Sequence, residues 1–147
     1  MFRSFMPEAM AEARAAAARG EVPVGAVVSR GGAVVARAGN RMRERADPTA
    51  HAEIEAIRAA CAALGTERLG GCALWVTLEP CAMCAGAVAA ARLDRLHFAA
   101  PDPKGGGVLH GARVLAHPQA HHRPEIHEGA MAAESAALLR SFFAARR

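Results

Sequence analysis

The segment CALWVTLEPCAMCAGAVAAAR, residues 72–92, joins a strand pattern directly to a helix pattern. Its first part, Cys72–Leu78, is a short apolar run rich in strand-forming residues. Its second part, Pro80–Arg92, is rich in alanine and opens with proline, which favours the first position of a helix. A strand that leads at once into a helix is the repeating unit of α/β proteins, so this segment predicts that fold class.

The flanking sequence extends the same alternation. Turn residues at 30–32 join two β-rich runs and predict a hairpin, whereas strands separated by helices pair in parallel. We therefore expect an α/β fold, a three-layer α/β/α sandwich with a central mixed five-stranded sheet flanked by helices. The expected strands are Val24–Ser29, Ala33–Ala38, Cys72–Leu78, Leu93–Ala99 and Glu125–His127. The expected helices are Met6–Arg19, His51–Leu64, Pro80–Arg92 and Met131 to the end, with loops at Arg41–Thr49 and 101–107.

Bulk composition narrows the class of protein. The 147 residues are 52% hydrophobic and 22% charged, which fits one globular domain over residues 1–147 and excludes a disordered chain. No apolar run has the length of a membrane span, and the first residues lack the apolar core of a secretory signal, so we expect a cytoplasmic protein. The formal charge of +4 permits a polyanionic partner but does not require one.

Two short motifs together predict a metal site. His51 and the pair Cys81 and Cys84 each stand at the start of an expected helix, where the partial positive charge favours thiolates. One nitrogen and two sulfur ligands suit Zn²⁺ with its fourth position left to water, which is typical of catalytic rather than structural zinc. Glu53 is too close to His51 to be a comfortable fourth ligand, but it is well placed to move protons.

Other interpretations of the cysteines remain open at this stage. Cys81 and Cys84 could form a thioredoxin-like redox pair, although His51 and Glu53 would then have no role. A structural zinc site would need Cys61 or Cys72 as a further ligand, and neither has the paired spacing of such sites. Both are expected to be small core residues.

The segments DPTAHAEI (47–54), VTLEPCAMCAGA (76–87), EVPVGAVV (21–28) and HRPEIHEG (122–129) carry a family resemblance. The chain resembles the zinc-dependent cytidine deaminase superfamily and, within it, the bacterial tRNA-specific adenosine deaminases, over nearly its whole length. The resemblance implies one Zn²⁺ per subunit held by His51, Cys81 and Cys84, with Glu53 as the catalytic proton shuttle. The implied reaction is hydrolysis of the wobble adenosine in a tRNA anticodon, that of tRNA-Arg ACG, to inosine and ammonia.

The resemblance also implies substrate contacts and partners. Asn40 matches a residue that binds the flipped nucleotide, and Asp102 matches a loop residue near the target ribose. Val24, Leu78 and Pro80 match walls of the substrate pocket. Each has a structural alternative: Asn40 could cap a turn, Asp102 could form a turn before Pro103, and Val24 would be buried in any fold. The implied partners are the tRNA anticodon stem-loop and a second copy of the chain in a homodimer, with no membrane.

Two other functions stay open. The same zinc chemistry serves deaminases of a free base or nucleoside, such as guanine or cytosine, and the metal motif alone does not separate these from a tRNA enzyme. A non-catalytic nucleic-acid-binding module could keep zinc for stability only. The loop PKGGGVLHGAR (103–113), rich in glycine, and the histidines 110, 117, 121 and 122 are not assigned a role by the sequence.

Overall fold

One mixed five-stranded sheet forms the centre of the computed structural model, which describes residues 3–146. Its strand order is β2-β1-β3-β4-β5; β1 pairs antiparallel with β2 and β3, whereas β3, β4 and β5 are parallel. The predicted hairpin and the parallel crossover pairs are confirmed. The strands are β1 (Gly25–Arg30), β2 (Ala33–Gly39), β3 (Cys72–Leu78), β4 (Arg95–Ala100) and β5 (Glu125–Glu128).

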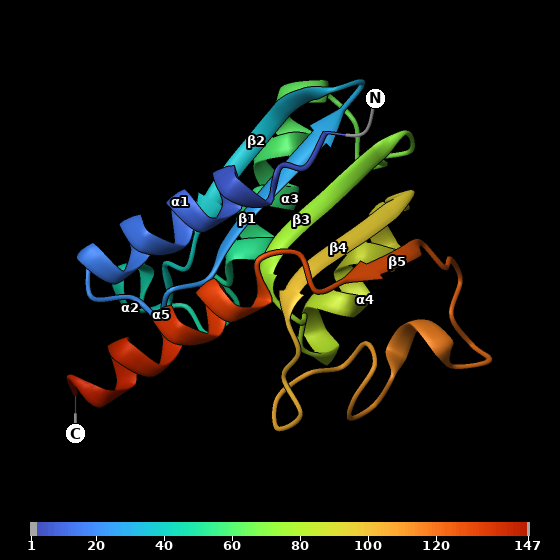
Figure 1. Cartoon of the computed structure of the whole chain (residues 1–147). Coiled ribbons are helices and arrows are strands. Elements are labelled where there is room, and N and C mark those ends of the chain that lie inside the picture. The colour runs from blue at the N-terminus through green and yellow to red at the C-terminus, as the bar shows by residue number, and fades with distance from the viewer. Residues whose placement is uncertain (1–2, 147) are drawn as a thin grey trace.

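Helices cover both faces of the sheet, which confirms the three-layer α/β/α sandwich (Figure 1). The helices α1 (Met6–Ala18) and α5 (Ala132–Ala144) lie on one face, and α3 (Ala52–Leu64) and α4 (Ala82–Ala91) on the other. Two apolar cores result because side chains alternate along each strand. Val28, Leu74 and Val76 point to the α3/α4 side, whereas Val27 and Trp75 point to the α1 side.

Helix α1 packs unusually close to β1 because Gly25 has no side chain. A Cβ atom at Gly25 would lie 2.0 Å from the carbonyl oxygen of Ala9 and 2.5 Å from the nitrogen of Ala13. Both are backbone atoms of α1, so the glycine sets the distance between helix and sheet.

Three rings form a stacked row across the α1 side of the sheet. Trp75, His97 and His127 are direct neighbours in the registers of β3, β4 and β5, so their side chains leave the sheet side by side. The ring centroids of Trp75 and His97 are 3.7 Å apart, and those of His97 and His127 are 4.7 Å apart. Burial lowers the pKa of His97 to about 4, with the charges of His127 and Arg95 acting in the same direction and that of Glu125 opposing it.

The structure differs from the sequence expectations in detail. The segment 41–49 was expected to be a loop, but it contains a one-turn helix, α2 (Met42–Arg45), and a 3-10 turn occupies Val114–Ala116. Helix α4 begins at Ala82 rather than Pro80, because Cys81 is extended and serves as its N-cap. Within residues 3–146, no helix combines the length and apolarity needed to cross a membrane.

The ring row predicts a pH-dependent stability. The folded protein keeps His97 neutral down to about pH 4, whereas the unfolded chain binds a proton near pH 6.5, so lowering the pH through this window favours unfolding. This single group makes the free energy of unfolding about 2 kcal/mol lower at pH 5 than at pH 8. The substitution His97→Phe keeps a stacking ring without the titration. Urea unfolding at the two pH values should therefore show a smaller loss of stability in the variant; an equal loss contradicts the assignment.

Candidate metal centre

The side chains of His51, Cys81 and Cys84 converge on one point beside the sheet. His51 is the N-cap of α3, Cys81 is the N-cap of α4, and Cys84 lies on the first turn of α4. The Nδ1 atom of His51 lies 3.7 Å from the Sγ atom of Cys81 and 3.5 Å from that of Cys84. One ligand atom from each residue lies within 4.8 Å of the others. Tertiary structure thus brings together the three residues that the sequence selected.

Local hydrogen bonds hold His51 at the start of its helix. The Asp47 carboxylate accepts the backbone N–H of Thr49 at 2.8 Å and its hydroxyl at 2.7 Å, which forms a turn just before the histidine. The Oδ1 atom of Asn40 accepts the N–H of Ala52 at 2.9 Å and so ties the end of β2 to the first turn of α3. The bond to Ala52 satisfies one of the first N–H groups of α3, which have no partner within the helix.

The three side chains fit a tetrahedral zinc ion. Ordinary Zn–N and Zn–S distances place nitrogen and sulfur ligands about 3.5–3.7 Å apart, which matches the two observed separations. Hydrogen bonds from Cys84 and His51 lower the pKa of Cys81 to about 3. The hydrogen bond that Cys84 makes to Cys81, together with burial, raises the pKa of Cys84 well above its usual range. A divalent cation bound at this point stabilises the thiolate of Cys84, so both cysteines can serve as ligands.

Glu53 lies next to this centre with almost no exposure to solvent. Glu53 is 4% exposed. Burial raises the pKa of its carboxyl to about 7, although a hydrogen bond to its own backbone and the charge of His51 act to lower this pKa. A carboxyl with a pKa near neutrality can both accept and release a proton at physiological pH.

A cleft of about 310 Å³ opens onto the centre. Val24, Asn40, Leu78 and Asp102 line it, as expected from the sequence. Pro80 differs: it is buried and is not among the lining residues, and its carbonyl accepts the N–H of Gly107 at 2.8 Å. The described residues that line the cleft are Val22, Val24, Asn40, Met42, His51, Glu53, Leu78, Glu79, Cys81, Asp102 and Gly105.

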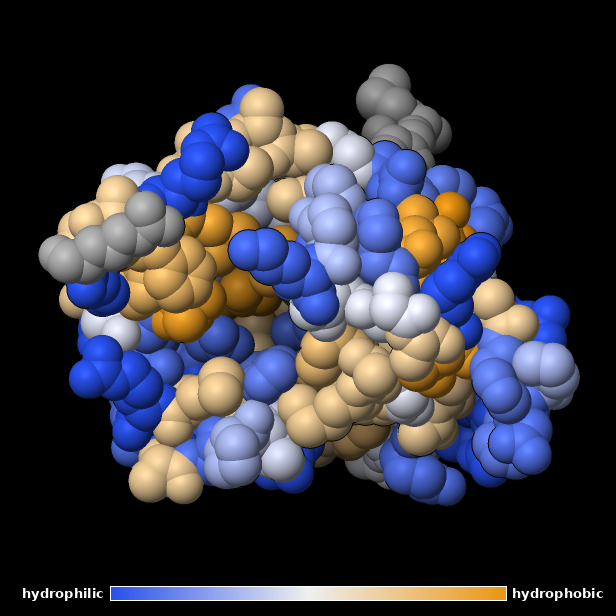
Figure 2. All heavy atoms as spheres, turned by 90° about the horizontal axis from the view of Figure 1, so that it is seen from below, coloured by the Kyte–Doolittle hydropathy of each residue, from blue (hydrophilic) through white to orange (hydrophobic). Residues whose placement is uncertain are grey.

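The structural alternatives for two lining residues also hold. Asn40 caps the start of α3, and the Oδ1 atom of Asp102 accepts the backbone N–H groups of Lys104 at 3.2 Å and Gly105 at 2.9 Å. Both residues thus shape the cleft walls as well as line them. Figure 2 views the molecule from below, where hydrophilic side chains surround patches of hydrophobic ones.

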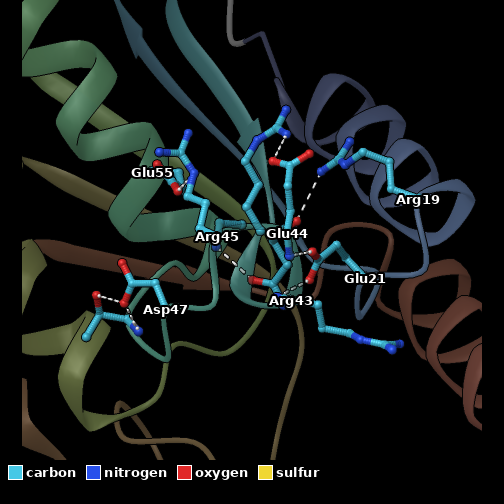
Figure 3. Close-up of polar contacts among 11 residues, drawn as sticks. Arg19, Glu21, Arg43, Glu44, Arg45, Asp47 and Glu55 are labelled. Carbon is cyan, nitrogen blue, oxygen red and sulfur yellow. Dashed lines mark hydrogen bonds and ion pairs between the residues drawn. The ribbon is translucent and has the colours of Figure 1, made fainter.

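A buried carboxylate that the sequence analysis missed supports one wall. Glu21 is 3% exposed and accepts the backbone N–H groups of Arg43 at 3.1 Å and Glu44 at 2.8 Å (Figure 3). These bonds explain why α2 forms in a segment that was expected to be a loop, and α2 places Met42 at the cleft. Arg45 pairs with Glu55 of α3 at 2.9 Å on the other side of the turn.

A second missed carboxylate, Glu79, lies directly between the lining residue Leu78 and Pro80. Burial raises the pKa of Glu79, but hydrogen bonds from the backbone of Asp102, the ring of His110 and the backbone of Leu109 and His110 outweigh it and hold the pKa below its ordinary value. The only sequence signal for this residue was an acidic side chain between an apolar strand and a proline.

The other cysteines and several histidines lie outside the metal cluster. Cys72 is buried and Cys61 is partly buried in the α3/α4 core, as expected. Among residues 3–146, His51, Cys81 and Cys84 form the one group of three ligating side chains, so the structure offers no support for a structural zinc at Cys61 or Cys72. Nε2 of His122 donates to the carbonyl oxygen of Leu93 at 2.6 Å, and Nδ1 of His110 lies 2.7 Å from Oε1 of Glu79.

Comparison with known proteins gives the same family by three routes. The family model of MafB19-like deaminases matches residues 2–147. The tRNA-specific adenosine deaminase of Agrobacterium fabrum is 54% identical over 143 residues, covering 97% of this chain and 94% of that protein. A solved structure from a study of A-to-I editing by tRNA:A34 deaminases is 54% identical and superposes with a TM-score of 0.91, covering 93% of this chain and 100% of the other. A guanine deaminase from Nitrosomonas europaea is 28% identical, with a TM-score of 0.77 and coverage of 95% and 82%.

The geometry predicts one tightly bound zinc ion per chain. The substitution Cys84→Ala removes a ligand and is expected to weaken zinc binding by at least 100-fold, because two protein ligands remain. Elemental analysis after dialysis against a mild chelator measures the loss. Cys61→Ala is the matched control and should keep a full complement of zinc. Retention of zinc by the Cys84 variant, or its loss from the control, contradicts the assigned ligands.

Proposed function

The chain belongs to the MafB19-like deaminase family, and we propose that it is a zinc-dependent tRNA-specific adenosine deaminase. The proposed reaction converts the wobble adenosine of a tRNA anticodon, that of tRNA-Arg ACG, to inosine with release of ammonia. The observation that carries the proposal is the cluster of His51, Cys81 and Cys84 beside Glu53, in a chain 54% identical to a tRNA-specific adenosine deaminase along 97% of its length. We place the activity in the cytoplasm, where tRNA is found.

In this proposal His51, Cys81 and Cys84 hold the zinc ion. The chemistry that zinc supplies at such a centre is activation of a water molecule as the nucleophile. Glu53 takes a proton from that water, delivers it to the purine ring, and then helps to protonate the departing amino group. Its pKa of about 7 suits both directions of transfer, and its burial keeps bulk water from competing for the proton.

The size and lining of the cleft suit a single nucleotide. Its volume of about 310 Å³ is at the lower end of the range of ligand pockets, so we propose that the target adenosine is flipped out of the anticodon loop into it. Val24 and Leu78 supply apolar surface for the base, while Asn40 and Asp102 supply polar contacts. Arg43 and Arg45 are exposed on α2 beside the cleft and add positive charge for phosphates.

A guanine deaminase is the second candidate. The TM-score of 0.77 to the Nitrosomonas europaea guanine deaminase, at 28% identity, favours it over other small-molecule deaminases. Measuring ammonia release from guanine, cytosine and adenosine as free compounds separates the two candidates. Turnover of a free base with none on tRNA would falsify the tRNA proposal.

The central experiment is an inosine assay on unmodified tRNA-Arg ACG with the zinc-loaded protein. Sequencing should detect inosine at the wobble position. The substitution Glu53→Ala should lower kcat by at least 1,000-fold while zinc content stays near one per chain, because Glu53 moves protons and does not bind the ion. Full editing by the Glu53→Ala protein would exclude a catalytic role for this residue and favour zinc as a purely structural element.

We also propose a homodimer that uses the surface of α4. Met83 is 39% exposed, and an apolar groove of about 340 Å³ lined by Gly86, Ala89 and Ala90 lies on the same helix. Light scattering should give twice the mass of one chain at micromolar concentration. Met83→Glu introduces a charge into this surface and should shift the protein toward the monomer; a monomeric wild type contradicts the proposal.

A further inference from the structure

The side chain of Glu79 is completely buried and points into the loop that follows β4. Its Oε1 atom accepts the backbone N–H of Asp102 at 3.1 Å and lies 2.7 Å from Nδ1 of His110. Its Oε2 atom accepts the backbone N–H groups of Val108 at 3.2 Å, Leu109 at 2.9 Å and His110 at 3.1 Å. One carboxylate therefore binds both ends of the segment 102–110.

Other contacts of this segment come from Val108, which is 2% exposed in the α3/α4 core, and from Gly107, whose N–H donates to the carbonyl of Pro80 at 2.8 Å. Gly106 lies so close to Glu79 that a Cβ atom would be 2.5 Å from Oε2 and 2.5 Å from the carbonyl oxygen of Asp102. A Cβ atom at Gly107 would lie 2.5 Å from the backbone nitrogen of Ala82, next to the ligand Cys81. The glycines allow the loop to close tightly around the carboxylate and against the start of α4. Around the buried Val108, backbone hydrogen bonds to Glu79 thus hold both ends of the loop.

The loop held in this way is a wall of the cleft. Asp102 and Gly105 line the cleft, and the N–H of Gly106 donates to the carbonyl of Asp102 at 2.8 Å, which closes the turn 102–106. Glu79 and the preceding Leu78 are also among the lining residues, although the side chain of Glu79 is turned into the loop and has no exposure to solvent. The position of this wall therefore depends on a residue that is not a metal ligand in the arrangement above.

We propose that Glu79 is a positioning residue that fixes the loop 102–110 as the wall against which the substrate nucleotide is bound. The inference rests on the proposed function for the identity of the substrate, but not for the loop contacts. Glu79 acts on binding through Asp102 and Gly105, and it leaves the metal ligands and Glu53 in place. Its loss should raise KM far more than it lowers kcat, because the wall contributes binding that substrate and transition state share.

The main variant is Glu79→Gln, which keeps the size of the side chain. It replaces one accepting oxygen by an NH₂ group, and this donor then faces backbone N–H groups that are donors themselves. Hydrogen exchange on the zinc-loaded protein should show the amides of Asp102 and 108–110 exchanging at least 30-fold faster than in the wild type, with the amides of α3 unchanged. KM for tRNA should rise at least 10-fold, kcat should fall less than 3-fold, and zinc content should remain near one per chain.

Two further variants calibrate the result. His110→Ala removes one of the five contacts and should raise KM about 3-fold, between the wild type and Glu79→Gln. Glu67→Gln changes an exposed glutamate outside the site and should match the wild type in every measurement.

Several outcomes overturn the proposal. Unchanged exchange at 102 and 108–110 in Glu79→Gln means that the loop does not depend on this residue. Faster exchange with unchanged KM means that Glu79 is only structural, and a loss of zinc or a dominant fall in kcat means that it acts on the metal centre. If the wild type edits no tRNA, the proposed function fails separately, and the exchange data together with KM for the free base that is turned over still decide the role of Glu79.

Discussion

The meeting of two helix N-termini is the constraint on which the rest of this structure depends. Helices α3 and α4 lie on the same face of the sheet, and their N-caps are His51 and Cys81. Each N-terminus carries partial positive charge and N–H groups without helical partners, which favours thiolate at this point. The 3.5 and 3.7 Å separations between imidazole and thiols follow from this packing, and the same packing buries Glu53 in the first turn of α3.

The strand arrangement makes that meeting possible. β3 pairs antiparallel with β1 and is followed directly by α4. The end of β3 therefore lies beside the open end of the hairpin, where Val24 precedes β1 and Asn40 follows β2. The residues that line the cleft consequently come from five separate parts of the chain. The close contact at Gly25 places α1 on one face of the sheet. The metal cluster lies at the other face, which α3 and α4 cover.

Two buried carboxylates hold backbone segments of the cleft walls in place. Glu21 and Glu79 are 3% and 2% exposed, and together they accept backbone N–H bonds from both sides of the cleft. A loop with buried N–H groups needs such acceptors, since an unpaired buried donor costs about 1–3 kcal/mol. Charged hydrogen bonds to Glu21 and Glu79 therefore hold the two walls in place. Each wall can be altered by one substitution that leaves the metal ligands unchanged.

The sequence by itself determined the sandwich fold and the metal cluster. Alternation of apolar residues is local, and Cys81 and Cys84 are neighbours on one helical turn, so both could be read from spacing. Only the tertiary structure decided which residues hold the walls of the cleft in place. Glu79 bonds to groups 23 to 31 residues away and Glu21 to groups 22 and 23 residues away, and their partners are backbone N–H groups that every residue except proline carries. Because such partners leave no mark in the sequence, α2, the anchoring of the loop 102–110 on Glu79 and the burial of Pro80 became visible only once the chain was folded.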